Sequence, residues 1–153
     1  MSKKFLYDIC IIGGLGHVGL PLGIVFSNKK QNVVLHDLDI KKADIVFRKK
    51  ELPYVEHGAL KLLKTALDKK KIHFSKNIDV ISKSKNIIIA IGTPVDKYLN
   101  PDIKNFLEYI KKIKKFITPH QNIIIRSSVF PNTCLNAYNI LGKNKNLAYC
   151  PER

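Results

Sequence analysis

The chain has 153 residues, of which 45% are hydrophobic, and this is enough for one domain with a single core. Its net charge of +15 would suit a nucleic-acid-binding protein. However, Lys, Ile and Asn, which share A/T-rich codons, dominate the composition, so a biased genome explains the excess of Lys. Because Arg occurs only at Arg48, Arg126 and Arg153, we expect no nucleic-acid partner. No apolar run approaches the roughly 18 residues of a transmembrane helix and no secretory signal is present, so we expect a cytoplasmic protein without a membrane partner.

Apolar runs of strand length alternate with segments of helical periodicity in the first half of the chain. Asp8–Ile12 is a short apolar run that ends at two glycines, which is typical of a buried strand. The elements predicted after it are, in chain order, a helix over 16–26, a strand over 33–35, a helix over 40–48, a loop over 52–58, a helix over 59–67, a strand over 72–74 and a helical turn over 77–82.

The second half of the chain continues this alternation. Ile87–Ile91 is entirely aliphatic and is the best candidate for a central strand, because a parallel strand is buried on both faces. The remaining predicted elements are a loop over 95–101, a helix over 103–117, a strand over 122–126, a helix over 133–141 and a strand over 147–149. The alternation predicts an α/β fold, in which a doubly wound and mainly parallel sheet carries helices on both faces.

A glycine-rich segment lies between the first predicted strand and the first predicted helix. The six residues Gly14, Leu15, Gly16, His17, Val18 and Gly19 have the spacing G-x-G-x-x-G. In this context Gly14 would allow a tight turn, Gly16 would let a pyrophosphate approach the backbone, and Gly19 would let the helix pack closely on the strand. The helix N-terminus would offer free N–H groups to the phosphates, so we predict a Rossmann-type dinucleotide site.

Asp37 ends the second predicted strand, at the usual distance of about 20 residues from this motif. A carboxylate there can accept hydrogen bonds from the adenosine ribose and would repel a 2′-phosphate, which favours NAD over NADP. The alternative is that Asp37 only begins a turn and that the glycines only form a loop.

Five segments together resemble the NAD-binding N-terminal domain of the UDP-glucose/GDP-mannose dehydrogenase family. These are GLGHVGLPLG at 14–23, PYVEHGAL at 53–60, Gly92-Thr93-Pro94 followed by Pro101-Asp102, RSSVFPNT at 126–133 and YCPER at 149–153. The resemblance extends from Ile9 to Arg153. It implies a part in an enzyme that uses two NAD to oxidise C6 of a nucleotide-linked sugar to a carboxylate, through a covalent cysteine intermediate.

The resemblance also implies roles for residues beyond the glycine motif. Thr93, Pro94 and Ser127 would lie near the cofactor, Ser128 would position the hydrolytic water, and Glu152 would act with that water as a base. The alternatives are that the two serines end a strand and cap a turn, and that Glu152 is an ordinary surface acid. The ending Pro-Glu-Arg and the long segment from Thr93 to Asp102 favour the branch that acts on UDP-N-acetylmannosamine.

Parts of the family pattern are missing from this chain. The catalytic cysteine of the family lies in a G-G-x-C-x-P-K-D-like segment that does not occur here. We interpret Cys150 as a strand-end residue and Cys10 as a buried one, and the three cysteines lack the spacing of a metal site. We therefore expect residues 1–153 to be a truncated NAD-binding domain without the central helix and the UDP-binding domain, inactive alone, whose complete enzyme is a homodimer. The alternative is a stand-alone NAD-binding module.

The histidines outside the glycine motif give weaker signals. His57 stands where the family often has proline, and it could lie close to the cofactor. His73 and His120 have no partner motif, and we expect both side chains to be exposed to solvent.

Overall fold

The computed structural model describes residues 5–92, 103–142 and 146–151. Its helices and strands are β1 (Tyr7–Ile12), α1 (Gly19–Asn28), β2 (Val33–His36), α2 (Ile40–Ala43), η1 (Asp44–Arg48), α3 (Ala59–Asp68), β3 (Ile72–Ser75), η2 (Ile78–Lys83), β4 (Ser84–Ile89), α4 (Ile103–Lys114), β5 (Asn122–Ile125), α5 (Thr133–Leu141) and β6 (Asn146–Tyr149). Strands and helices alternate as the sequence predicts.

The described strands form one parallel sheet with the order β3-β2-β1-β4-β5-β6. The chain builds outward from β1 to β3 and then returns to place β4 on the other side of β1. The strand order therefore reverses between β1 and β4, and in such sheets ligands bind at the carboxyl ends of the strands beside this switch point. The predicted Rossmann-type, doubly wound fold is confirmed.

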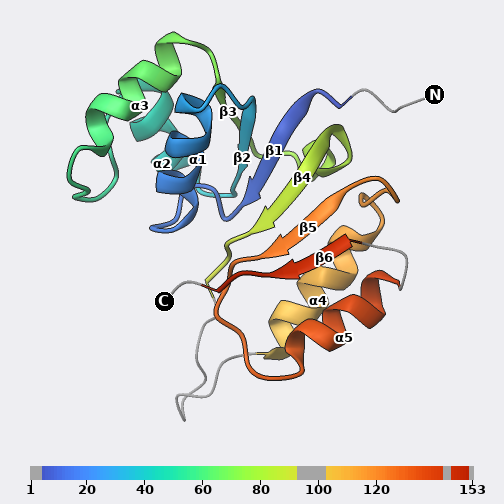
Figure 1. Ribbon diagram of the computed structural model, residues 1–153. Helices are drawn as coiled ribbons and strands as arrows, with labels where there is room; N and C mark the ends of the chain where they lie inside the picture. Colours follow the sequence, from blue (N-terminus) through green and yellow to red (C-terminus); the bar gives the residue numbers. More distant parts are fainter. Residues whose placement is uncertain (1–4, 93–102, 143–145, 152–153) are drawn as a thin grey trace.

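Two hydrophobic cores lie on opposite faces of the sheet, because successive strand residues point to alternate sides. Ile9 and Ile11 of β1 pack in the core that contains the buried residues of α1 and α3, whereas Cys10 and Ile12 pack in the core that contains those of α4 and α5. Figure 1 shows α1, α2 and α3 beside β1–β3, and α4 and α5 beside β4–β6. Helices thus cover both faces, each over a different half of the sheet.

Some boundaries differ from the prediction. Helix α1 begins at Gly19 rather than Gly16, because the residues from Gly13 to Val18 form the turn that connects it to β1. The predicted helix over 40–48 changes from α-helix to a wider π-helical turn at Asp44. Strand β4 covers Ser84–Ile89 rather than 87–91, and α4 ends at Lys114 rather than 117. Among the described residues, no helix is long and apolar enough to cross a membrane.

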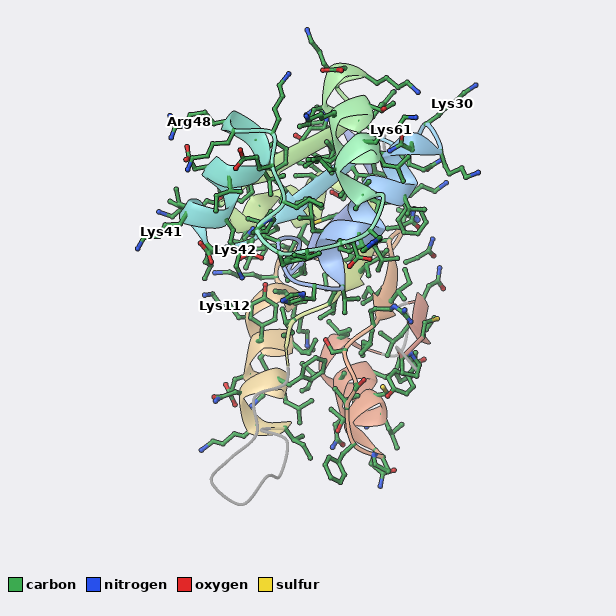
Figure 2. All side chains as sticks on the ribbon, turned by 90° about the vertical axis from the view of Figure 1, so that its left-hand side faces the viewer. Lys30, Lys41, Lys42, Arg48, Lys61 and Lys112 are labelled. Carbon is green, nitrogen blue, oxygen red and sulfur yellow. The ribbon has the colours of Figure 1, made fainter. Side chains whose placement is uncertain are left out.

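Basic side chains lie on several elements rather than on one helix. Figure 2 labels Lys30 after α1, Lys41 and Lys42 in α2, Arg48 in η1, Lys61 in α3 and Lys112 in α4. Lys42 and Arg48 form ion pairs with Asp39 and Asp44 of their own helical turns. Exposed pairs of this kind contribute little to stability.

Candidate functional site

The turn after β1 is built from glycines that are packed against the sheet. Gly13 has a φ of +76°, and its N–H and that of Gly14 both donate to the carbonyl oxygen of His36 at the end of β2 (3.0 and 3.2 Å). A Cβ atom on Gly14 would lie 2.7 Å from the Cβ of Leu35. The tight turn that we expected at Gly14 is therefore made by Gly13, and Gly14 is required for close packing on β2.

The third and fourth glycines of the turn have different surroundings. A Cβ atom on Gly19 would lie 2.3 Å from the carbonyl oxygen of Gly13. Gly19 therefore packs the start of α1 against the turn itself, whereas we had expected it to pack the helix against the strand. Among the atoms of the described residues, a Cβ atom on Gly16 would meet only the same oxygen within 4 Å, at 3.3 Å. Gly16 is thus the glycine of the motif that is bare toward open space.

The amides that follow Gly16 are the donors of a helix N-terminus. The first bond of helical spacing runs from the N–H of Leu20 to the carbonyl oxygen of Gly16 (3.0 Å). The N–H groups of His17, Val18 and Gly19 come before it, where a helix supplies no acceptor of its own. Together with the helix dipole, they make this turn a favourable place for an anion such as a diphosphate.

Asp37 lies directly after β2 and contacts the glycine turn. Its Oδ2 accepts a hydrogen bond from the N–H of Leu15 (2.9 Å), and its Oδ1 accepts one from the N–H of Asp39 (3.1 Å). The side chain of Leu15 is fully buried, so this residue contributes its backbone to the turn. A carboxylate oxygen has a second lone pair, and Asp37 can therefore hold the turn and still accept a hydrogen bond from a ribose.

Two cavities flank the turn at the carboxyl edge of the sheet. One, of about 410 Å³, is lined by residues that include Gly13, Asp37, Ile91 and Tyr109. The other, of about 400 Å³, is lined by Gly16, His17, Val18, Ile91, Ser127 and Ser128 among others. Ile91, after β4, borders both cavities, so the two spaces lie on either side of the switch point between β1 and β4.

The two serines after β5 differ in their surroundings. The hydroxyl of Ser127 is buried and donates to the carbonyl oxygen of Ile91 (2.7 Å), which ties the exit of β5 to the exit of β4. Ser128 is exposed and also lines the second cavity. Ser127 thus makes a contact at the end of a strand, as in the alternative in which the serines only end a strand and cap a turn. Thr93, Pro94 and Glu152 lie outside the described residues.

Two residues at the site were missed by the sequence analysis. The hydroxyl of Tyr54 donates to the carbonyl oxygen of Gly16 (2.8 Å), and its ring stacks on that of His17. The guanidinium of Arg126 donates to the carbonyl oxygens of Cys150 and Pro151, directly before Glu152. The resemblance drew attention to the segments PYVEHGAL and RSSVFPNT that contain them, but it does not show which side chains of these segments contact the site.

The histidines and cysteines outside the glycine turn form no metal site within the described residues. His57 and His120 are exposed, but the expectation for His73 was wrong, because its ring is half-buried and its Nε2 lies 2.9 Å from Oδ1 of Asn32. Burial raises the pKa of the Cys10 thiol to about 12, so this cysteine stays protonated. Among the described residues, no group of three or more His, Cys, Asp or Glu side chains could hold a metal ion.

The glycine turn, Asp37 and the two cavities have the arrangement expected for a dinucleotide. A family model described as the UDP-glucose/GDP-mannose dehydrogenase family, NAD binding domain, matches residues 7–153. The chain belongs to this family. NAD is accordingly the cofactor of this NAD-binding domain.

Two relatives are similar to this chain over nearly its whole length. The chain is 31% identical to Protein CapL of Staphylococcus aureus, over 95% of this chain and 35% of CapL. It is 30% identical to a UDP-N-acetyl-D-mannosamine dehydrogenase of Methanococcus vannielii, over 99% of this chain and 35% of that enzyme. The chain thus spans about a third of the length of these relatives.

A solved structure has the same fold. The UDP-N-acetyl-mannosamine dehydrogenase Cap5O from Staphylococcus aureus superimposes with a TM-score of 0.82 at 24% identity, over 95% of this chain and 37% of that one.

Proposed function

We propose that NAD lies across the carboxyl edge of the sheet, with its diphosphate on the turn from Gly16 to Gly19. The adenosine ribose would bind Asp37 in the first cavity, and the nicotinamide half would enter the cavity beside Ser127. The observation that carries this placement is the set of amides at the start of α1, which have no intrahelical acceptor and lie beside the open backbone of Gly16, where an anion could bind them. His17 and Val18 contribute amides to the same turn.

We propose further that this domain serves an enzyme that oxidises the C6 alcohol of a UDP-sugar to a uronate, with UDP-N-acetylmannosamine as the preferred type. The relatives from Methanococcus and Staphylococcus that carry this activity in their names support the proposal. When bound, NAD would supply the hydride acceptor. Ser128 borders the same cavity and has a hydroxyl that can position a water molecule, and we assign to Glu152 the role of its base. The complete enzyme would be a homodimer.

A stand-alone NAD-binding module is the second candidate. In this case the domain would bind NAD without chemistry, and none of Cys10, Cys134 and Cys150 lies in a segment that resembles the family's catalytic motif. The DNA after the codon for Arg153 separates the two candidates, since a continuing frame with that motif favours the enzyme. Formation of NADH from UDP-N-acetylmannosamine or UDP-glucose by the purified 153-residue chain would contradict our assignment of the catalytic cysteine to another segment.

The placement of NAD is tested by calorimetric titration of the chain with NAD and NADP. We expect NAD to bind more tightly, and the substitution Asp37→Asn to weaken NAD by about tenfold, because one charge-assisted hydrogen bond to the ribose is lost. The one acceptor oxygen of Asn can still accept from the N–H of Leu15 in the turn, while the N–H of Asp39 loses its partner. Loss of the negative charge should narrow the gap between NAD and NADP.

Asp68→Asn is the matched control, because the Asp68 carboxylate is exposed in a surface ion pair with Lys50. This variant should bind both dinucleotides as the unmutated chain does. Tighter binding of NADP than of NAD by the unmutated chain would refute the role of Asp37.

A further inference from the structure

The loop between η1 and α3 reaches across to the glycine turn and contacts it through Tyr54. The hydroxyl of Tyr54 donates to the carbonyl oxygen of Gly16 at 2.8 Å. Its ring stacks on the ring of His17, with 4.0 Å between the centroids and 28° between the planes. One side chain therefore contacts two successive residues of the turn.

Tyr54 is itself held in place. Its side chain is partly buried and packs, with Phe47 and Leu52, against the core that contains Leu63 of α3. Burial raises the pKa of the Tyr54 hydroxyl well above its ordinary value, so the group keeps its proton and remains a donor. The contact with Gly16 thus comes from a side chain that is anchored in the core rather than free at the surface.

The hydrogen bond from Tyr54 determines the direction of a backbone amide. The carbonyl oxygen of Gly16 accepts a second hydrogen bond from the N–H of Leu20 (3.0 Å), so two donors hold it toward the protein. The peptide unit that joins Gly16 to His17 is planar and trans, and its C=O and N–H point in opposite directions. Fixing the carbonyl inward therefore aims the N–H of His17 away from it, on the side where a ligand can approach.

We propose that Tyr54 is a positioning residue for the diphosphate of the cofactor. By holding the carbonyl of Gly16, it keeps the N–H of His17 directed at the anion, while its ring holds the side chain of His17 beside the turn. This inference rests on the proposed placement of the diphosphate on the same turn.

The test compares ligands that have and lack the diphosphate. Tyr54→Phe removes the hydroxyl and keeps the ring that stacks on His17. We expect this variant to bind NAD and ADP about fivefold more weakly, which is the loss of one ordinary hydrogen bond. Its affinity for adenosine, followed by NMR titration at millimolar concentrations, should be unchanged. Tyr7→Phe is the control, since it also removes a phenol hydroxyl, and Tyr7 lies at the end of β1 that is far from the glycine turn.

The outcomes separate the role of Tyr54 from the placement of the cofactor. Equal affinity of Tyr54→Phe and the unmutated chain for ADP would overturn the positioning role. Equal losses for ADP and adenosine would overturn it as well, because they would indicate a general disturbance of the fold. If the unmutated chain binds ADP no better than adenosine, the placement of the diphosphate fails, and the role of Tyr54 fails with it.

Discussion

Two glycines of the same turn should respond in opposite ways to alanine. A Cβ atom on Gly14 would lie 2.7 Å from the Cβ and 2.8 Å from the Cα of Leu35, and 2.9 Å from the carbonyl oxygen of Ile11. A Cβ atom on Gly16 would meet one atom of the described chain within 4 Å, the carbonyl oxygen of Gly13 at 3.3 Å. We therefore expect Gly14→Ala to disturb folding and Gly16→Ala to disturb cofactor binding.

The distances set the size of each effect. Carbon atoms pack comfortably at about 3.5–4.0 Å, so the methyl group of Gly14→Ala would have to push backbone atoms of two adjacent central strands by most of an ångström. Such overpacking costs about 1–3 kcal/mol, and we expect the upper end because neither strand can rotate away. For a domain of this size, that lowers Tm by about 5–10 °C.

Gly16→Ala should leave the free energy of unfolding nearly unchanged. The φ of Gly16 is not positive, so alanine can adopt it, and the loss of chain entropy in the unfolded state offsets the one close contact. The new methyl group would stand where the diphosphate approaches the backbone. We expect NAD to bind at least about tenfold more weakly, since an amide hydrogen bond to an anion is lengthened or lost.

The assays are thermal unfolding without ligand and calorimetric titration with NAD, applied to both variants and the unmutated chain. The two effects should fall on different variants, with stability lost in Gly14→Ala and affinity lost in Gly16→Ala. Unchanged NAD affinity in Gly16→Ala would refute our assignment of this glycine to the diphosphate. An unchanged Tm in Gly14→Ala would refute the packing argument.

Two further predictions concern titratable side chains. Burial, aided by the charge of Lys71, lowers the pKa of His73 below its ordinary 6.5, so His73 takes up its proton at a higher pH in the unfolded chain than in the folded one, and the free energy of unfolding should fall as the pH drops below about 6.5. In urea unfolding measured at several pH values, His73→Phe should reduce this fall, whereas His120→Phe, the control, should leave it unchanged. The same pH dependence in both variants would contradict the assignment to His73. Cys150 is exposed, whereas Cys10 is fully buried and its thiol has a raised pKa. A thiol reagent should therefore modify Cys150 in the folded chain and Cys10 only in urea. Fast modification of Cys10 without denaturant would contradict this prediction.

The sequence predicted the order and type of the elements because apolar periodicity is a local property. Its errors fall where distant residues decide. Strand β4 begins at Ser84, although Ser84-Lys85-Asn86 is polar and resembles a loop. Asn86 belongs to the sheet because its side-chain amide donates to the carbonyl oxygen of Asp8 in β1 and accepts from the amide of Asn122 in β5. The local sequence around β4 does not show that these two strands lie beside it.

At the candidate site, too, the sequence failed where contacts between distant residues decide the structure. The G-x-G-x-x-G spacing located the turn, but the role of each glycine depends on its neighbours in three dimensions, since only these determine which glycine is packed and which is exposed. Tyr54 is 38 residues from Gly16, and nothing in the spacing of PYVEHGAL shows which of its side chains faces the turn. His73 was misjudged for a similar reason, because its partner Asn32 precedes a different strand.

Polar groups at the amino ends of the strands and those at the carboxyl ends have different roles. At the amino edge, side chains join strand to strand: Asn146 donates to Asn122, Asn122 to Asn86, and Asn86 to the backbone of Asp8. The carboxylate of Asp8 continues the series by accepting from the N–H of Asn32. These polar groups are thus satisfied within the protein, and they join neighbouring strands to one another. At the carboxyl edge, the helix N-terminus of α1 presents donors that have no intrahelical acceptor, so a bound anion would satisfy them. Substitutions that loosen the asparagine series should therefore act on unfolding, and those at the glycine turn's open face on the cofactor.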